Sequence, residues 1–223
     1  GRYLAVVSNA DKVPAIGTNN DIFLVPVQGE GAVANLTDGN EANDNCPLFS
    51  PDGAWMAYRA QLRPGFEADR HHLMLYDRKT AKVRDLTPDW TLSVDEMVWV
   101  PDSQAIYAAV EEQARSVIYR ISISDGSRRK VVDEGHTQTP RITPDGRTLV
   151  CLRETANQPD EVHAVDLERG IARRLSHIND QVLSGLAMNP VEGFWFTGAR
   201  NEKVHGLILK PPFFDASRKY PVI

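Results

Sequence analysis

The chain has few cysteines, and none of them lies in a metal-binding pattern. Only Cys46 and Cys151 occur among its 223 residues. A disulfide framework would need more cysteines, and the C-x-x-C spacing typical of zinc sites is missing. We therefore expect two unpaired thiols and no cysteine-bound metal.

Basic clusters and long apolar runs are also missing. The net charge is −5 at pH 7 and no basic block interrupts the sequence, which argues against nucleic acid as a partner. No apolar run approaches the ~20 residues that a membrane-spanning helix requires, so no membrane contact is expected. A composition that is 42% hydrophobic and 25% charged is instead typical of a globular protein with its own core.

The sequence also lacks the periodicity of amphipathic helices. No window sustains apolar residues at i, i+3, i+4 and i+7, whereas short apolar runs alternate with turn residues throughout the chain. Short strands with regularly spaced turns predict an all-β fold.

A turn sequence repeats along the chain. Ser50-Pro51-Asp52-Gly53 precedes an apolar run, and the same pattern returns at Pro101, at Pro144 and, in worn form, at Pro190. Proline fixes φ, aspartate bonds the backbone two residues on, and glycine accepts a positive φ. The prolines lie 50, 43 and 46 residues apart. A second landmark keeps step with them: Leu36-Thr37, Leu86-Thr87, Val132-Asp133 and Leu175-Ser176. Periods of this length, built from short strands, predict a β-propeller.

Each repeat is interpreted as one four-stranded blade. The expected complete blades have strands at 46–50, 55–60, 73–77 and 83–87; at 97–100, 105–110, 117–122 and 130–132; and at 141–143, 148–153, 161–166 and 172–175. A first, incomplete blade has strands at 3–8, 21–27 and 32–37, and a last one includes 194–196. The prediction for residues 1–200 is a partial β-propeller of about three full blades with a half-blade at each end.

The first residues fit into the repeat. Gly1-Arg2-Tyr3 aligns with Gly146-Arg147-Thr148, and Gly1 lies 52 residues before Gly53, about one period. On this basis we expect that the chain starts inside a blade and that further blades precede it.

Residues 201–223 leave the repeat. Val204-His205-Gly206-Leu207-Ile208-Leu209-Lys210-Pro211-Pro212 is followed by Phe214-Asp215 and then by Lys219-Tyr220-Pro221-Val222-Ile223. This ending resembles the junction in the prolyl oligopeptidase family of serine peptidases, where a β-propeller leads into an α/β-hydrolase domain. The stretch 58–70 resembles the bacterial dipeptidyl-peptidase and acylaminoacyl-peptidase branch. The resemblance implies that residues 201–223 are a linker and the first strands of a hydrolase domain.

The resemblance implies a function for a longer protein, but it places no catalytic residue in this chain. The family's nucleophile lies in a G-x-S-x-G element, and no serine here has glycine at both −2 and +2. The implied role is a propeller that gates short peptide substrates into a serine exopeptidase, with its own C-terminal hydrolase domain as partner. The compartment, bacterial periplasm or cytoplasm, stays open. The alternative is a non-enzymatic TolB-like propeller that acts as a binding scaffold; the ending at 204–223 argues against it.

Two carboxylates are candidates for substrate binding. Glu67 and Asp69 lie in the long connection between the second and third strands of one blade. Such connections open on the same face as the blade-to-blade connections, and we expect the hydrolase domain to cover that face. A carboxylate pair can hold a substrate α-ammonium through charge-assisted hydrogen bonds. The alternative is that both residues pair with Arg63 and Arg70 and order the loop.

Two other motifs have structural interpretations. His71 and His72 are adjacent, so on a strand they face opposite sides of the sheet and cannot chelate one metal. Residues 29–34 resemble a dinucleotide-binding G-x-G-x-x-A element, but a strand rather than a helix is expected to follow. A hairpin turn is therefore predicted there, and no cofactor.

Overall fold

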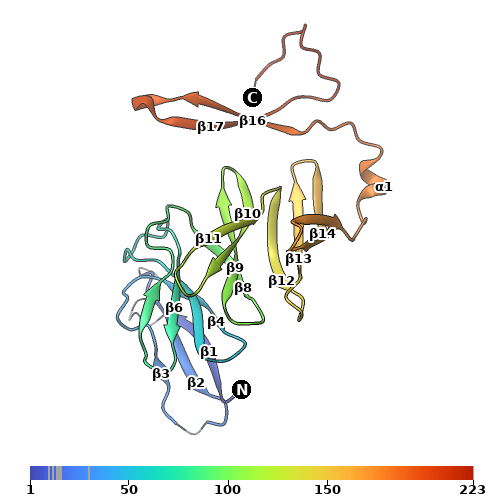
Figure 1. Ribbon diagram of the computed structural model, residues 1–223. Coiled ribbons are helices and arrows are strands. Elements are labelled where there is room, and N and C mark those ends of the chain that lie inside the picture. Colours follow the sequence, from blue (N-terminus) through green and yellow to red (C-terminus); the bar gives the residue numbers. More distant parts are fainter. Residues whose placement is uncertain (10, 12, 14–16, 30, 223) are drawn as a thin grey trace.

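The structure, a computed structural model, describes residues 1–9, 11, 13, 17–29 and 31–222. Strands dominate it, arranged as neighbouring antiparallel sheets with a hairpin beyond one end of them (Figure 1). The predicted all-β fold class is confirmed. No helix among the described residues is long and apolar enough to cross a bilayer.

The first two blades are separate sheets. The first has three strands in the order β1–β2–β3, and the second has four in the order β4–β5–β6–β7. Their bounds are β1 (Tyr3–Asn9), β2 (Asn20–Pro26), β3 (Ala34–Asn35), β4 (Asp44–Phe49), β5 (Trp55–Ala60), β6 (His72–Asp77) and β7 (Val83–Asp85). The first sheet lacks an innermost strand, as the incomplete first repeat predicted.

The third and fourth blades form one continuous sheet of eight strands. The third contains β8 (Val94–Trp99), β9 (Ala105–Glu112), β10 (Arg115–Ser122) and β11 (Arg128–Val132). The fourth contains β12 (His136–Ile142), β13 (Thr148–Thr155), β14 (Gln158–Asp166) and β15 (Ile171–Arg174). One parallel pairing, between Ser116 of β10 and His136 of β12, joins the two blades.

The repeated turn has the conformation that its residues predict. Gly53 has a φ of 71°, and Gly146 in the third copy has a φ of 72°. Asp52 accepts a hydrogen bond from the backbone N–H of Ala54 at 3.0 Å. Ser103 occupies the glycine position of the second copy and also has a positive φ, 60°. The turn is therefore a structural element that joins the first two strands of each blade.

The glycine-rich stretch 29–34 joins antiparallel strands. Phe23 of β2 pairs with Asn35 of β3, and Gly29 and Gly31 both have positive φ. Glu30, in the middle of the predicted turn, lies outside the described residues. A strand follows the glycines, so the stretch is a hairpin connection of the blade and has no resemblance to a nucleotide-binding loop in space.

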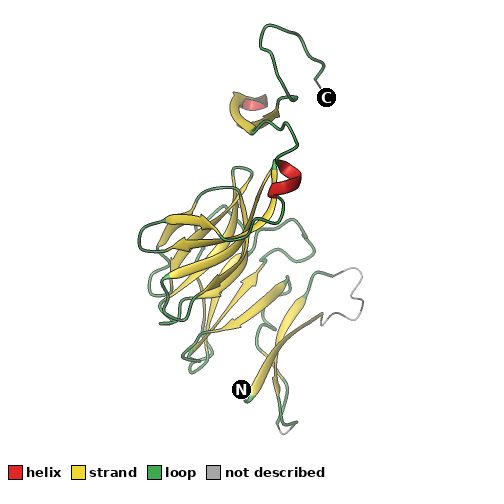
Figure 2. Ribbon diagram, turned by 90° about the vertical axis from the view of Figure 1, so that its right-hand side faces the viewer, coloured by secondary structure: helices red, strands yellow, loops and turns green. Residues whose placement is uncertain are grey.

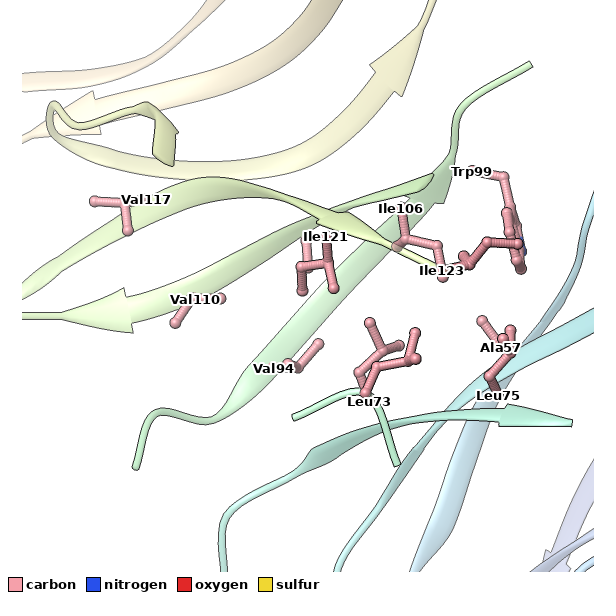
Figure 3. Close-up of a cluster of buried hydrophobic side chains, with 12 residues drawn as sticks. Ala57, Leu73, Leu75, Val94, Trp99, Ile106, Val110, Val117, Ile121 and Ile123 are labelled. Atoms are coloured by element: carbon pink, nitrogen blue, oxygen red, sulfur yellow. The ribbon is translucent and has the colours of Figure 1, made fainter. Parts of the chain in front are cut away.

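The core lies between the blades. Ala57, Leu73 and Leu75 of the second blade face a set of buried side chains of the third blade (Figure 3). The members on the third blade are Val94, Trp99, Ile106, Ala108, Val110, Val117, Ile121 and Ile123. Leu73 is fully buried, and the Trp99 indole donates a hydrogen bond to the Leu48 carbonyl at 2.9 Å. Packing between blades therefore stabilises this propeller segment.

The chain after the fourth blade forms a separate unit. A short helix, α1 (Asp180–Leu183), leads to β16 (Val191–Thr197), the turn η2 (Ala199–Asn201) and β17 (Lys203–Leu209). β16 and β17 pair with each other and with no other described strand. The strand predicted at 194–196 lies within β16, and its partner among the described strands is β17. Figure 2 shows α1 and this hairpin beyond one end of the blades.

Candidate functional site

The connections between second and third strands gather with the blade-to-blade connections. In the second blade this connection spans residues 61–71. Its Gly65 backbone N–H donates to Thr18 Oγ1 at 2.9 Å, which joins it to the equivalent connection of the first blade. Asn40, in the loop between these blades, donates from Nδ2 to the Gln61 carbonyl at 2.9 Å. One face of the propeller is thus built from these two kinds of loop, as expected from the sequence.

A buried glutamine shapes the 61–71 loop. The Gln61 side chain is 3% exposed and donates to the carbonyls of Glu67 and Asp69 at 2.9 and 2.7 Å. These two bonds hold the outer part of the loop against the end of β5. They fix the backbone that carries both candidate carboxylates.

The Asp69 carboxylate is committed to its own loop. Its Oδ2 accepts backbone N–H groups of Leu62 and Arg63 at 2.9 and 3.0 Å, and its Oδ1 lies 3.7 Å from Arg63 Nε. Partial burial alone would raise its pKa, but the backbone donors and the guanidinium outweigh that effect and lower the pKa of Asp69. Asp69 therefore stays ionised and orders the loop.

Glu67 is differently placed. It is solvent-exposed, and no salt bridge of the described residues includes it. Arg70, the other proposed partner, donates to the carbonyls of Thr87 and Pro88 at 3.1 and 3.2 Å. The two candidate carboxylates thus differ in their contacts. Asp69 binds groups of its own loop, whereas Glu67 is exposed and can contact a ligand.

The adjacent histidines serve different contacts. His72 Nδ1 lies 2.6 Å from Asp85 Oδ2. His71 donates its backbone N–H to Ser93 Oγ at 3.0 Å, and burial lowers the pKa of its imidazole. The described residues contain no group of three potential metal ligands.

One cavity lies between the blades and the C-terminal hairpin, with a volume of about 620 Å³. Arg115 and His136 come from the third and fourth blades, Glu154 from the end of β13, and His205 from β17. The His205 ring stacks on Trp195 with 4.6 Å between ring centroids. The sequence did not predict this site, because the segments that line it come from two blades and the hairpin and are separate along the chain.

A second cavity, of about 470 Å³, is lined by residues of β4, β5, β8 and β12. It contains Cys46, Arg59, Asp95 and Arg141. Arg59 forms an ion pair with Asp95 of the neighbouring blade. Cys46 is exposed and Cys151 is buried, and both are unpaired thiols.

Comparison with known proteins connects this architecture to a peptidase group. No protein-family model matches the chain. Dipeptidyl-peptidase 5 of Porphyromonas endodontalis is 32% identical over 209 residues, and that of Porphyromonas gingivalis is 27% identical over 209 residues. The chain is a homologue of these dipeptidyl-peptidases 5. Each alignment covers 94% of the chain but 30% of the relative, so the chain spans about a third of the length of these relatives.

Solved structures agree on the fold. Pyrococcus horikoshii acylaminoacyl peptidase superposes with a TM-score of 0.76 at 19% identity, over 99% of the chain and 33% of that protein. Porphyromonas gingivalis dipeptidyl peptidase 4 gives 0.68 at 19% identity, over 99% of the chain and 31% of that protein. TolB from Acinetobacter baumannii gives 0.60 at 20% identity, over 93% and 49%. Together with the dipeptidyl-peptidase 5 sequences, these findings confirm the predicted resemblance to the prolyl oligopeptidase family.

Proposed function

We propose that this chain is the substrate-gating propeller part of a serine exopeptidase of the dipeptidyl- or acylaminoacyl-peptidase type. The observation that carries the proposal is the sequence similarity to dipeptidyl-peptidases 5, which extends over 94% of the chain. TolB from Acinetobacter baumannii shares the blades, but its TM-score is 0.60, whereas that of acylaminoacyl peptidase is 0.76. The proposed partners are short peptides and a C-terminal hydrolase domain.

In this proposal the reacting groups lie outside the 223 residues. Peptide hydrolysis by this route needs a serine nucleophile, a histidine base and oxyanion donors. The chain contains no G-x-S-x-G element. The propeller supplies access and substrate positioning, and the chain by itself is inactive.

The test compares the longer gene product with the isolated chain. The downstream sequence should contain a G-x-S-x-G element within ~150 residues, the distance over which the nucleophile elbow of an α/β-hydrolase would follow. The longer protein should release the fluorophore from dipeptidyl amides and react with a fluorophosphonate probe, whereas the 223-residue chain should do neither. A stop codon close to Ile223, or a full-length protein inert to both reagents, would overturn the proposal.

We propose further that Glu67 contacts the α-ammonium of the substrate, with Asp69 as support. The exposed Glu67 carboxylate stands on a loop whose backbone is fixed by Gln61 and Asp69, so it is preorganised for a charge-assisted contact. Asp69 acts through the loop backbone in this scheme. Both residues lie on the face where a hydrolase domain is expected.

The experiment replaces Glu67 with Gln in the full-length enzyme. KM for a free-amino dipeptidyl substrate should rise about tenfold, the loss expected for one hydrogen bond between charged groups. KM for the N-acetylated substrate should stay unchanged. Glu168→Gln, an exposed carboxylate in the turn between β14 and β15, is the matched control. An unchanged KM for the free-amino substrate in Glu67→Gln rules out this contact.

The domain division also remains a proposal. The predicted boundary between residues 200 and 201 falls inside η2, the turn that joins β16 to β17. Because a paired hairpin is a poor place for a domain boundary, we propose that the propeller ends with β15 and that the hairpin belongs to the next domain. Limited proteolysis of the full-length protein should cut within 175–190 and spare 198–202.

A further inference from the structure

The first and fourth blades differ in the residue at one repeated position of their third strand. Just after this position, a backbone N–H donates to a hydroxyl of the blade-closing landmark: Ile22 to Thr37 at 3.0 Å in the first blade, and Val162 to Ser176 at 2.8 Å in the fourth. The residue before that N–H is Asp21 in the first blade and Glu161 in the fourth.

The two carboxylates have different reach. Asp21 accepts hydrogen bonds from Thr37 Oγ1 and Asn35 Nδ2, both within its own blade. Glu161 is one methylene longer. It accepts the Ser176 hydroxyl, and it also accepts the backbone N–H and the side-chain Nδ2 of Asn179 at 3.1 and 3.3 Å. The acid of the last blade therefore binds the chain beyond the blade.

The segment that Glu161 binds has few other anchors. Residues 175–190 join β15 to β16, and α1 within them has no buried residue. Ile178 and Val182 are 80% and 69% exposed. At its far end, Asn189 Nδ2 donates to the Pro211 carbonyl at 2.7 Å, which joins the segment to the chain that follows β17. Its position relative to the blades thus depends on contacts near residue 179.

Glu161 is suited to hold that position. Glu161 is only 1% exposed, so water does not compete with Ser176 and Asn179 for hydrogen bonds to its carboxylate. The donors from Ser176 and from the 178–179 backbone lower the pKa of Glu161 to about 2, which keeps it charged at every physiological pH. A second, exposed ion pair supports it: Asp180 lies 2.5 Å from Arg174 of β15 and 2.9 Å from His177.

We infer that Glu161 is a positioning residue: it fixes the course of segment 175–190 and, through it, the placement of the β16–β17 hairpin over the loop face. The effect of Glu161 on segment 175–190 can be measured in this chain. Its consequence for catalysis rests on the proposed function, because only a domain that follows the hairpin would make its placement matter for a substrate.

The primary test is hydrogen exchange on the 223-residue chain. In Glu161→Gln, amides of residues 178–186 should exchange about tenfold faster, as expected when a hydrogen bond to a charged acceptor is lost, while β13 amides keep their protection. Glu168→Gln in the same blade is the control and should change neither. Asn179→Ala, which removes one donor from the segment side and leaves the blade intact, should give a smaller change in the same amides.

Unchanged exchange at 178–186 in both Glu161→Gln and Asn179→Ala overturns the inference. Faster exchange across the whole fourth blade in Glu161→Gln, with no change in Asn179→Ala, also overturns it, because Glu161 would then stabilise only the blade. In the full-length enzyme, Glu161→Gln and Asn179→Ala should lower kcat more than they raise KM. If that enzyme proves inactive, the proposed function fails and the exchange result still stands.

Discussion

Thr87 Oγ1 accepts a hydrogen bond from the backbone N–H of Leu73 at 2.9 Å. The two residues are 14 positions apart, and both are fully buried. This contact explains why Leu86-Thr87 recurs as a sequence landmark. At the end of the ladder between β6 and β7, the Thr87 hydroxyl replaces a backbone carbonyl as the acceptor of the Leu73 N–H. Ile22 with Thr37 and Val162 with Ser176 repeat it.

Replacement of Thr87 by Val should lower the free energy of unfolding by about 1–3 kcal/mol, since it leaves the buried Leu73 N–H without an acceptor at nearly constant volume. Urea denaturation followed by tryptophan fluorescence measures the change. Thr91→Val, at an exposed position in the next loop, is the control and should change stability by less than ~0.5 kcal/mol. Equal effects at both positions would mean that the hydroxyl contact does not close the blade.

Replacement of Leu73 by Ala should cost about 2–5 kcal/mol, because it opens a cavity in the cluster between the second and third blades. Leu62→Ala, where the side chain is 48% exposed, serves as the comparison and should have a small effect. Scanning calorimetry gives both values. A loss below ~1 kcal/mol at Leu73 would show that the interface between these blades repacks without it.

Stability should fall as pH rises from 4 to 7 through the titration of Asp44. This residue is 1% exposed, and its Oδ2 has no hydrogen-bond partner within the described structure. Burial, together with the nearby Asp21 charge, raises its pKa from 3.8 to about 7 against the opposing hydrogen bond from Asn40. A group with a raised pKa in the folded state stabilises the fold when protonated, and this contribution is lost as pH passes the folded-state value.

Asp44→Asn removes that titration. The free energy of unfolding of the variant should vary less between pH 4.5 and 8 than that of the parent chain, by on the order of 2 kcal/mol. Urea titrations at several pH values measure the slope. Asp102→Asn, on an exposed turn, is the control. Identical slopes in Asp44→Asn and the parent chain would show that Asp44 is already charged in the fold at pH 4.5.

The two thiols should differ in reactivity. Cys46 is exposed, whereas Cys151 is buried and its burial raises the pKa of the thiol. A disulfide reagent such as Ellman's should modify one thiol per folded chain, and the second only in denaturant. Cys46→Ser should abolish the fast phase and Cys151→Ser should leave it. Two fast-reacting thiols in the folded chain would contradict the burial of Cys151.

Local residue patterns predicted a strand correctly where an apolar run directly follows the repeated turn. The strand at 55–60 has the bounds of β5, because the turn fixes one end and the loop at Gln61 fixes the other. The start of the strand predicted at 141–143 was placed five residues too late: β12 starts at His136. A register shift between Gln138 and Arg141 breaks the alternation on which the prediction depends. Thr139 in this irregularity has a φ of 49°.

Contacts between residues far apart along the chain could not be predicted from local residue patterns. Pro190 fits the repeat, yet β16 pairs with β17, which is the next strand along the chain and is joined to it by a short turn. The loop carrying Glu67 and Asp69 was predicted, but the different roles of the two carboxylates depend on which backbone donors the fold directs at each one. The same holds for Glu161, whose partners lie 15 and 18 residues away.

The parallel pairing of Ser116 with His136 has a consequence for where this segment can open. It joins the third and fourth blades through main-chain bonding, reinforced by a hydrogen bond from the Ser116 hydroxyl to the Thr137 carbonyl at 2.7 Å. The first and second blades are separate sheets, and a main-chain hydrogen bond from the Val94 N–H to the His71 carbonyl, at 3.0 Å, joins the second blade to the third. A transient gap wide enough for a guest molecule would therefore form first at the seam between the first and second blades, while the third and fourth blades move together.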